Sequence, residues 1–344
     1  MIRFDNDYTR GAHERIIQKL METNMEQTPG YGADPHCERA HELIREACAA
    51  PHADVHLLVG GTQANLAIIA SILKPYQAIL SPVTGHINTS ETGAIEATGH
   101  KVLTLPTKDG KITATQVRES LVAHFEYAGR IHNPQPGMLY LTQSTETGLL
   151  YTRSELEQMR TVCDEFDIPL FIDGARLGYA LASPSNDATL TDLARLCDIF
   201  YIGGTKQGAL FGEAVVITND KFKKDFRYIM KQRGALLAKG RLLGVQFETL
   251  FEDNLYQDIS KHAILMATQL KEAFESVGIT FKYEVLANQL FPILTNVQFQ
   301  KLSKKYVLMA WEELEDNRQI VRICTDWSTD PSHVENLASD IKLL

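Results

Sequence analysis

Short apolar runs alternate with longer segments between residues 55 and 217, and in the longer segments apolar residues recur every three or four positions. Short runs of this kind are typical of strands buried on both faces, and the longer segments are typical of amphipathic helices. The expected strands are Val55 to Val59, Gln77 to Leu80, Lys101 to Leu105, Met138 to Thr142, Pro169 to Asp173, Asp198 to Ile202 and Glu213 to Ile217. The expected helices are Thr62 to Leu73, Thr113 to His124, Ser154 to Phe166 and Thr189 to Leu196. This alternation predicts an α/β fold with a mostly parallel sheet covered on both faces.

The pattern changes near residue 221. Helical stretches rich in Lys, Arg and Leu run through Phe251, and a further helix is expected over Ile259 to Val277. Short strands are expected within Thr280 to Gln298 and at Gln319 to Thr325. We therefore predict a large domain with an N-terminal arm at residues 1–250, and a smaller α+β domain at residues 251–344.

The composition narrows the class of protein. The chain has 344 residues, of which 44% are hydrophobic and 22% are charged, as in ordinary globular proteins. Its net charge of −9 and its lack of a basic run argue against nucleic acid as a partner.

No apolar window approaches the roughly 18 residues that a membrane helix needs. The first residues, Met1 to Asp7, are acidic, whereas a secretory signal begins with positive charges. The five cysteines are scattered and show no C-x-x-C spacing. We expect a cytoplasmic protein with no membrane segment, no disulfide framework and no metal site.

Polar motifs follow three of the predicted strands. Gly60-Gly61-Thr62 follows the first strand, Asp173-Gly174 follows a middle one, and Thr205-Lys206 follows a later one. Because ligands of such sheets bind beyond the carboxyl ends of the strands, these motifs predict a binding site.

Each motif taken alone also has a plain structural interpretation. Two glycines let backbone amides approach an anion at a helix N-terminus, but they also suit a tight turn before a helix that Thr62 caps. Asp173 alone is typical of a helix cap, and Lys206 alone is typical of a solvated surface lysine. Together, Asp173 and Lys206 favour pyridoxal phosphate, because an acid can hold a protonated pyridine nitrogen while a lysine forms the Schiff base.

Six stretches then make a more specific pattern. They are Tyr31-Gly32-Ala33-Asp34-Pro35, Gly61-Thr62-Gln63-Ala64-Asn65, His86 with Glu91 and Gly93, Asp173-Gly174-Ala175-Arg176, Thr205-Lys206, and Arg322-Ile323-Cys324-Thr325-Asp326-Trp327. In these stretches the chain resembles the threonine aldolase group of the β-eliminating lyase family. That family has the aspartate aminotransferase-like fold, fold type I of the pyridoxal phosphate enzymes.

The resemblance implies a role for each matching residue. Lys206 resembles the Schiff-base lysine and Asp173 the partner of the pyridinium nitrogen. His86 is similar to the histidine that stacks on the cofactor ring and takes part in proton transfer. The remaining cofactor contacts implied by the resemblance are Gly61 and Thr62 at the phosphate, with Thr205 and Arg176 nearby.

The resemblance also implies a substrate and an assembly. Arg176 and Arg322, with Asn6, are similar to the residues that hold the carboxylate of an amino acid substrate, a role suited to bidentate arginine. Family sites are shared between subunits, so a homodimer or homotetramer is expected. The residues expected to reach a neighbour's cofactor are Tyr31, Arg233 and Arg241.

The sequence departs from the family pattern at several positions. Gly60 and Thr205 stand where serine is usual, and Asn6-Asp7 replaces Ser-Asp. Leu236 to Leu242 replaces a glycine-rich stretch, and a second family histidine is matched only approximately by His132. These changes leave the cofactor expectation in place and put the substrate preference in question.

The implied activity is retro-aldol cleavage of a β-hydroxy-α-amino acid, such as L-threonine or L-allo-threonine, to glycine and an aldehyde. Two alternatives use the same cofactor, namely a β-eliminating lyase and an aminotransferase. A third is a non-catalytic binding protein of the same fold, because a fold does not prove an activity.

Overall fold

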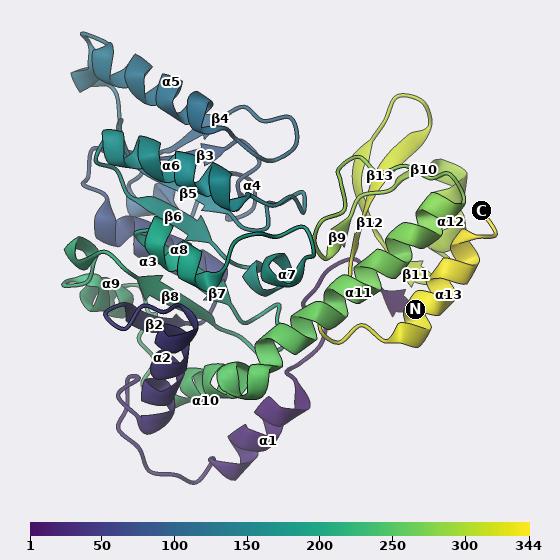
Figure 1. The fold of residues 1–344 in the computed structure, drawn as a ribbon, viewed down its shortest axis with the longest axis horizontal. Helices are drawn as coiled ribbons and strands as arrows, with labels where there is room; N and C mark the ends of the chain where they lie inside the picture. Colours follow the sequence, from purple (N-terminus) through teal and green to yellow (C-terminus); the bar gives the residue numbers. More distant parts are fainter.

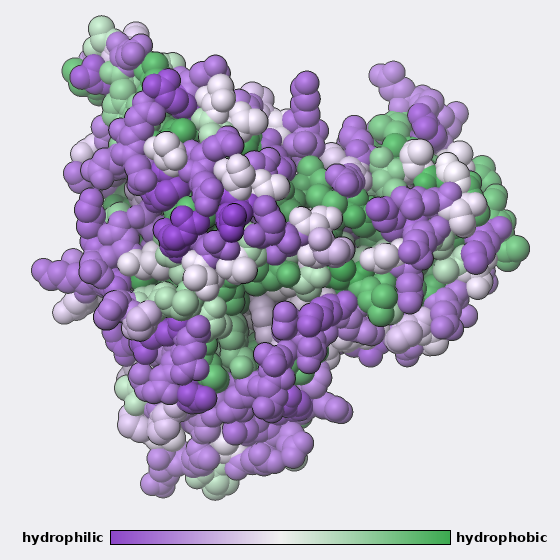
Figure 2. Space-filling view, in the orientation of Figure 1, coloured by the Kyte–Doolittle hydropathy of each residue, from purple (hydrophilic) through white to green (hydrophobic).

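The computed structural model describes all 344 residues. Figure 1 shows a larger part built on a central sheet and a smaller C-terminal part, joined by the long helix α11 (Leu255–Ser276). Both chain termini lie beside the C-terminal part (Figure 1). Apolar residues reach the surface mainly where the two parts meet, around α7 (Leu177–Ala182) and α11, whereas most of the visible surface is hydrophilic (Figure 2).

The central sheet has seven strands in the order β2-β8-β7-β6-β5-β3-β4. Only β8 runs antiparallel to its neighbours, so the carboxyl ends of the other six strands lie at one edge. The strands are β2 (Asp54–Leu58), β3 (Gln77–Pro82), β4 (Val102–Leu105), β5 (Gln135–Thr142), β6 (Leu170–Asp173), β7 (Ile199–Gly203) and β8 (Glu213–Ile217). All seven strands predicted in this region are present, and the predicted α/β fold is confirmed.

Alternate residues of each strand bury into different hydrophobic clusters, as the pleat requires. Ile172 and Phe200 belong to a cluster of 38 residues, and Phe171 and Tyr201 belong to a second cluster of 20 residues. The first cluster packs against α2 (Pro35–Ala47), α5 (Ala114–Glu126), α6 (Arg153–Glu165), α8 (Leu190–Leu196) and α10 (Arg241–Phe251). The second packs against α3 (Gly61–Ile72) and α9 (Phe226–Gln232). Burial on both faces explains why the strands read as continuous apolar runs.

The C-terminal part contains a small antiparallel sheet in which β13 (Arg318–Cys324) is central. Its partners are β9 (Gln289–Leu290), β10 (Ile293–Thr295) and β12 (Met309–Glu313). A third cluster of 16 residues lies between this sheet, α11 and α13 (Pro331–Ile341), and it includes Phe4 from the chain start.

The chain start is attached to the C-terminal part. Strand β1 (Ile2–Arg3) pairs in parallel with β11 (Tyr306–Val307). The chain then runs toward the central sheet and forms α1 (Glu14–Glu22). Residues 4–13 therefore connect the two parts of the molecule.

The structure corrects two expectations from the sequence. Asn296–Leu302 is a helix, α12, whereas strand was expected through residue 298; Thr295 and Gln298 form a capping box that starts the helix there. The basic stretch after residue 221 forms two helices, α9 and α10, separated by a turn at Gly234, whose φ of 72° favours glycine. None of the helices is both long and apolar enough to cross a membrane.

At Gly174, which directly follows β6, the backbone lies very close to β7. A Cβ added at Gly174 would lie 1.8 Å from the carbonyl oxygen of Tyr201. We expect Gly174→Ala to lower the free energy of unfolding by about 1 to 3 kcal/mol, the usual cost of overpacking. Urea unfolding of the cofactor-free protein measures the change. Gly60→Ala is the matched control, because a Cβ at Gly60 meets nothing within 4 Å, and equal stabilities for the two variants would contradict this account.

Candidate active site

Four of the predicted site residues lie at one edge of the sheet. His86 follows β3, Asp173 ends β6 with Arg176 shortly after it, and Lys206 follows β7. Strands β3, β5, β6 and β7 are parallel neighbours in the sheet. The loops that follow these strands therefore meet at the edge where α/β sheets bind ligands.

Asp173 is a buried carboxylate without a cationic partner. Its side chain accepts hydrogen bonds from Tyr140 Oη at 2.7 Å, Asn65 Nδ2 at 3.0 Å and the Ala175 amide at 3.0 Å. The residue is only 2% exposed, and no Lys, Arg or His nitrogen lies within ion-pair distance. A buried charge of this kind is costly unless a cation pairs with it. A protonated pyridine nitrogen would supply the positive charge that Asp173 lacks.

His86 is connected to Asp173 through two neighbouring side chains. Its Nδ1 donates to Glu91 Oε1 at 2.7 Å, and Asn65 Nδ2 donates to the same oxygen at 2.7 Å as well as to Asp173. Burial lowers the pKa of His86, but the hydrogen bond to Glu91 and the charges of nearby carboxylates together outweigh burial, so the pKa is raised. Glu91 Oε2 and Asn65 Oδ1 are buried without partners. Neither Glu91 nor Asn65 has a role that the sequence predicts, although both lie in stretches that match the family pattern.

Lys206 is half-buried and its ammonium group makes no hydrogen bond or ion pair within the chain. Its backbone is fixed: Tyr179 Oη donates to the Lys206 carbonyl, and Thr205 Oγ1 accepts from the Gly212 amide at 3.0 Å. Gly212 itself has a φ of 132°. A lysine held by its backbone, with a free amine, suits covalent attachment of a cofactor.

Glu213 is a buried acid close to Lys206 that the sequence did not identify. Burial raises the pKa of Glu213 to about 8, against the opposing charge of Lys206. Its Oε2 accepts from the Gly204 amide at 3.2 Å. At neutral pH this group is therefore mostly uncharged, which leaves the Lys206 charge without a fixed counter-ion on that side.

The amino end of α3 suits a phosphate. The helix begins at Gly61, and its N-cap residue, Gly60, provides no side-chain cap. Thr62 lies inside the helix and is exposed, so the interpretation in which Thr62 caps the helix is wrong. Free amides at the positive end of a helix bind anions. Gln63 Nε2 donates to the Arg233 carbonyl at 3.4 Å, which places that part of the chain beside the same helix end.

The two arginines predicted to bind a carboxylate are both tied to the segment that crosses from the C-terminal part. Arg176 donates to Asp7 through Nε at 2.7 Å and Nη2 at 3.0 Å, and both side chains are buried. Arg322 Nη2 donates to the Asp5 carbonyl at 3.0 Å. Asn6 lies between these anchors but bonds only to Asp5 and Tyr8. Asp7 thus occupies two nitrogens of Arg176 and leaves Nη1 for a ligand.

Asp7 also joins the two parts of the molecule, because Asn288 Nδ2 donates to it at 2.9 Å. We expect Asp7→Asn to lower the free energy of unfolding by on the order of 3 kcal/mol, since it leaves Arg176 buried without a counter-charge. Burial would raise the pKa of Asp7, but the charges of Arg176 and Lys206 lower it from 3.8 to about 2. This stabilisation is therefore complete above pH 3.8 and is lost as the pH falls toward about 2.

Urea unfolding of the wild type and Asp7→Asn at several pH values between 7 and 2 measures this effect. The two stabilities should differ at neutral pH and converge in acid. Asp253→Asn is the control, because Asp253 pairs with Arg15 at the surface with 82% of its side chain exposed, and exposed pairs contribute less than about 1 kcal/mol. A constant gap across the pH range would contradict the assignment.

The structure does not bring the other predicted residues into this site. Tyr31 is 44% exposed, and its carbonyl accepts from Arg227 Nη2 at 2.7 Å. Arg241 donates to the Thr23 carbonyl of its own chain. His132 is exposed in the turn before β5, at the opposite edge of the sheet from Lys206.

The chain is similar to known proteins of one family along most of its length. The profile of the β-eliminating lyase family matches residues 5–296. The low-specificity L-threonine aldolases of Pseudomonas aeruginosa and of a Pseudomonas species are 29% and 30% identical to the chain, and each alignment covers 99% of the chain and 97% of the relative.

Solved structures give the same result for the fold. The threonine aldolase of Leishmania major is 44% identical, with a TM-score of 0.97 over 100% of this chain and 99% of the other. A Thermus thermophilus aspartate aminotransferase has a TM-score of 0.73 at 12% identity, covering 100% of this chain and 92% of the other, which shows the shared fold alone. The predicted aspartate aminotransferase-like fold is confirmed. Because the family profile extends over most of its length, the chain belongs to the β-eliminating lyase family.

Proposed function

We propose that the protein is a pyridoxal phosphate-dependent lyase that cleaves a β-hydroxy-α-amino acid, such as L-threonine or L-allo-threonine, to glycine and an aldehyde. The observation that carries the proposal is the buried Asp173 carboxylate, which has three neutral donors and no cation. Two curated relatives along the full chain, and a solved structure at 44% identity, are named threonine aldolases.

The residues present fit the cofactor. Lys206 would attach it covalently, Asp173 would bind its ring nitrogen, and Gly61 and Thr62 would bind its phosphate at the start of α3. When bound, the cofactor supplies a conjugated ring that accepts the electron pair left when the bond between Cα and Cβ breaks. Asp173 favours this because its negative charge keeps the ring nitrogen protonated.

The substrate is held by the chain's own charges. Arg176 presents Nη1, because Asp7 fixes the other side of its guanidinium group. Arg322 is held by the Asp5 carbonyl and lies over the Trp311 ring at 5.3 Å. A carboxylate bound by two fixed guanidinium groups is restricted in direction as well as position, so the bond that breaks is selected by orientation.

We also propose a homodimer or homotetramer whose partner is a second copy of the chain. The support is the outer face of α1 and the residues after it, where Ile17, Met21 and Met25 are 39%, 75% and 87% exposed. Light scattering of the purified protein tests this, and an active monomer would contradict it. The five cysteines are unpaired and buried, which supports the reducing cytoplasm as its location.

Product analysis tests the activity. The purified protein, reconstituted with pyridoxal phosphate, is incubated with L-threonine and with L-allo-threonine, and glycine and acetaldehyde are measured together. Equal amounts of both products are expected. Release of ammonia and a 2-oxo acid would indicate β-elimination instead, and a requirement for an added 2-oxo acid would indicate an aminotransferase.

A further inference from the structure

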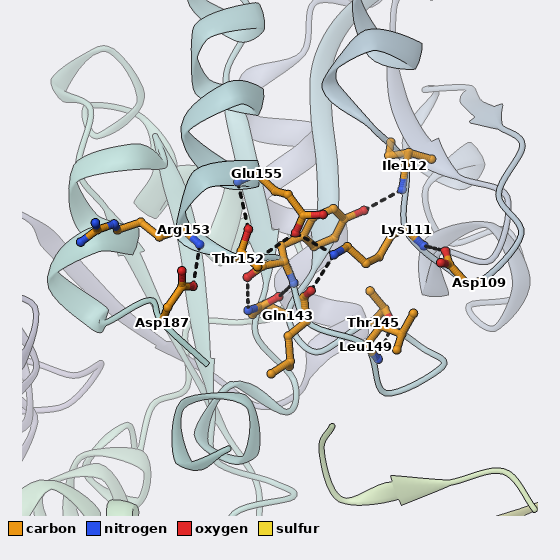
Figure 3. A network of polar contacts seen from close by, with 12 residues as sticks. Asp109, Lys111, Ile112, Gln143, Thr145, Leu149, Thr152, Arg153, Glu155 and Asp187 are labelled. Atoms are coloured by element: carbon orange, nitrogen blue, oxygen red, sulfur yellow. Dashed lines mark hydrogen bonds and ion pairs between the residues drawn. The ribbon is translucent and has the colours of Figure 1, made fainter. Parts of the chain in front are cut away.

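Hydrogen bonds join the two sides of the loop after β5, at Gln143 and at Thr145 with Leu149 (Figure 3). At its base, Gln143 Nε2 donates to the Tyr151 carbonyl at 3.1 Å, and Gln143 Oε1 accepts from the Tyr151 amide at 2.9 Å. At its turn, the Leu149 amide donates to Thr145 Oγ1 at 3.0 Å. The Thr145 hydroxyl also lies 2.9 Å from that of Thr147. These bonds join the two sides of the loop at its base and at its turn.

Contacts from other elements fix the position of the loop as well. Lys111 Nζ donates to the Leu150 carbonyl at 2.8 Å and to Glu155 Oε2 at 2.6 Å, as Figure 3 shows. On the other side, a Cβ added at Gly148 would lie 3.3 Å from the Gln289 carbonyl oxygen, so the C-terminal part packs directly against the loop. The loop is therefore a rigid element between the two parts of the molecule.

Glu146 is the one residue of this loop that is not fully buried. Every other residue from 136 to 151 is buried, whereas Glu146 is half-buried at the tip of the turn. Its carboxylate makes no hydrogen bond and no ion pair. A charged group that a rigid turn presents without a partner contributes nothing evident to stability, which points to a ligand.

The sheet order places the loop that holds Glu146 between two strands that lead to site residues. Strand β5 lies between β3, which leads to His86, and β6, which leads to Asp173 and Arg176. The charge of Glu146 acts on groups from each of these strands. Burial lowers the pKa of His86, and the charge of Glu146 helps to raise it, after the larger effect of the hydrogen bond to Glu91. The same charge helps to raise the pKa of Tyr140, after burial and Asp173. Burial lowers the pKa of Arg176, and Glu146 adds a small part to the rise that Asp7 mainly causes.

We propose that Glu146 is the group that takes the proton from the β-hydroxyl of the substrate. This inference rests on the proposed function and assigns its proton acceptor. The O–H bond breaks and its proton passes to a Glu146 carboxylate oxygen. The electron pair of that bond becomes the second bond of the aldehyde carbonyl. The bond between Cα and Cβ breaks, its electron pair is taken up by the bound cofactor, and Cα later receives a proton to give glycine.

Glu146 suits this role better than His86 does. The Nδ1 atom of His86 is committed to Glu91 at 2.7 Å, and its raised pKa increases the fraction that already carries a proton near neutral pH. An ionised carboxylate can only accept hydrogen bonds. Arg176 can bind the substrate carboxylate through Nη1, so the site would combine a fixed cation with a fixed proton acceptor.

Glu146→Gln tests the proposal, because glutamine keeps the shape and removes the acceptor charge. We expect kcat for L-threonine cleavage to fall by roughly a hundredfold or more. The dissociation constants of the cofactor and of glycine should stay within about twofold, because glycine has no hydroxyl group. Glu146→Asp should recover part of the loss, because it restores a carboxylate at the same position.

Two further measurements separate proton transfer from a structural role. Glu165→Gln removes the charge of a surface acid that pairs with Arg118 and has 41% of its side chain exposed, and it should leave kcat within about threefold. In the cofactor-free protein, NMR titration should show a lower pKa for His86 in Glu146→Gln than in the wild type, because Glu146 contributes to its raised value.

The outcomes are distinct. If the wild type releases no aldehyde from any β-hydroxy-α-amino acid, the proposed function fails. If the wild type is active and Glu146→Gln is equally active, this inference alone fails. It also fails if Glu146→Gln loses glycine binding together with cleavage, because that result assigns Glu146 to the architecture of the site.

Discussion

Replacing Lys206 by alanine is expected to lower aldehyde release from L-threonine by roughly a thousandfold or more, the scale seen when a covalent catalytic group is lost. The same change should abolish tight retention of pyridoxal phosphate through dialysis. The stability of the cofactor-free protein should fall only modestly, because the Lys206 ammonium makes no bond within the chain and Arg176 remains beside Asp7.

Absorbance of the dialysed protein and a coupled aldehyde assay measure the two effects, and urea unfolding measures the third. Lys221→Ala is the matched control, because Lys221 is a surface lysine with 70% of its side chain exposed. Retention of a borohydride-reducible cofactor by Lys206→Ala would show that another amine attaches it, and the assignment of Lys206 would then be wrong.

Asp173→Asn is expected to lower kcat by about a thousandfold in protein that is fully loaded with cofactor, because an amide cannot keep the ring nitrogen protonated. Tyr140→Phe should have a much smaller effect, of about tenfold or less, since it removes one neutral hydrogen bond to the same carboxylate. Steady-state rates at saturating cofactor, with loading checked by absorbance, separate the two variants. Asp173→Asn turning over L-threonine at the parent rate would exclude the proposed role.

Asp173→Asn should lower activity without lowering stability. Asp173 lacks a cation in the cofactor-free protein, so removing its charge should leave the free energy of unfolding unchanged or higher. Asp7→Asn should lower it, because Arg176 loses its counter-charge. The change in the free energy of unfolding should therefore differ in sign between the two aspartates. Urea unfolding of both cofactor-free variants distinguishes a carboxylate that binds the cofactor from one that stabilises the fold.

The strands of the central sheet were predictable because each is buried on both faces and therefore carries an uninterrupted apolar run. β8 matches its predicted bounds, Glu213–Ile217, and the others differ by a few residues at their ends. The short strands and helices of the C-terminal part were harder to predict. There the apolar patterns are too short to separate strand from helix. Helix caps, such as Thr295 with Gln298, decide between the two.

For the site, the sequence identified the residues that stand directly after a strand, such as Asp173 and Lys206. It did not identify the partners of these residues. Glu91 and Asn65 meet only because the loop that holds Glu91 reaches helix α3, and Asp7 reaches Arg176 across 169 positions. Such contacts have no local pattern, since they depend on the order of strands in the sheet. Glu146 cannot be recognised from the sequence, because it stands out only when the burial of the residues around it is known.

The pairing of β1 with β11 has a consequence for biosynthesis. Ile2 pairs with Tyr306, which lies 304 positions later in the chain, so β1 is synthesised long before its partner strand. Until then residues 1–13 lack their pairing with the C-terminal part, and the arginine anchors near Asp5 and Asp7 remain incomplete. Contacts between such distant parts of a chain form late and slowly. The nascent protein therefore acquires its central sheet before its substrate-binding site is complete.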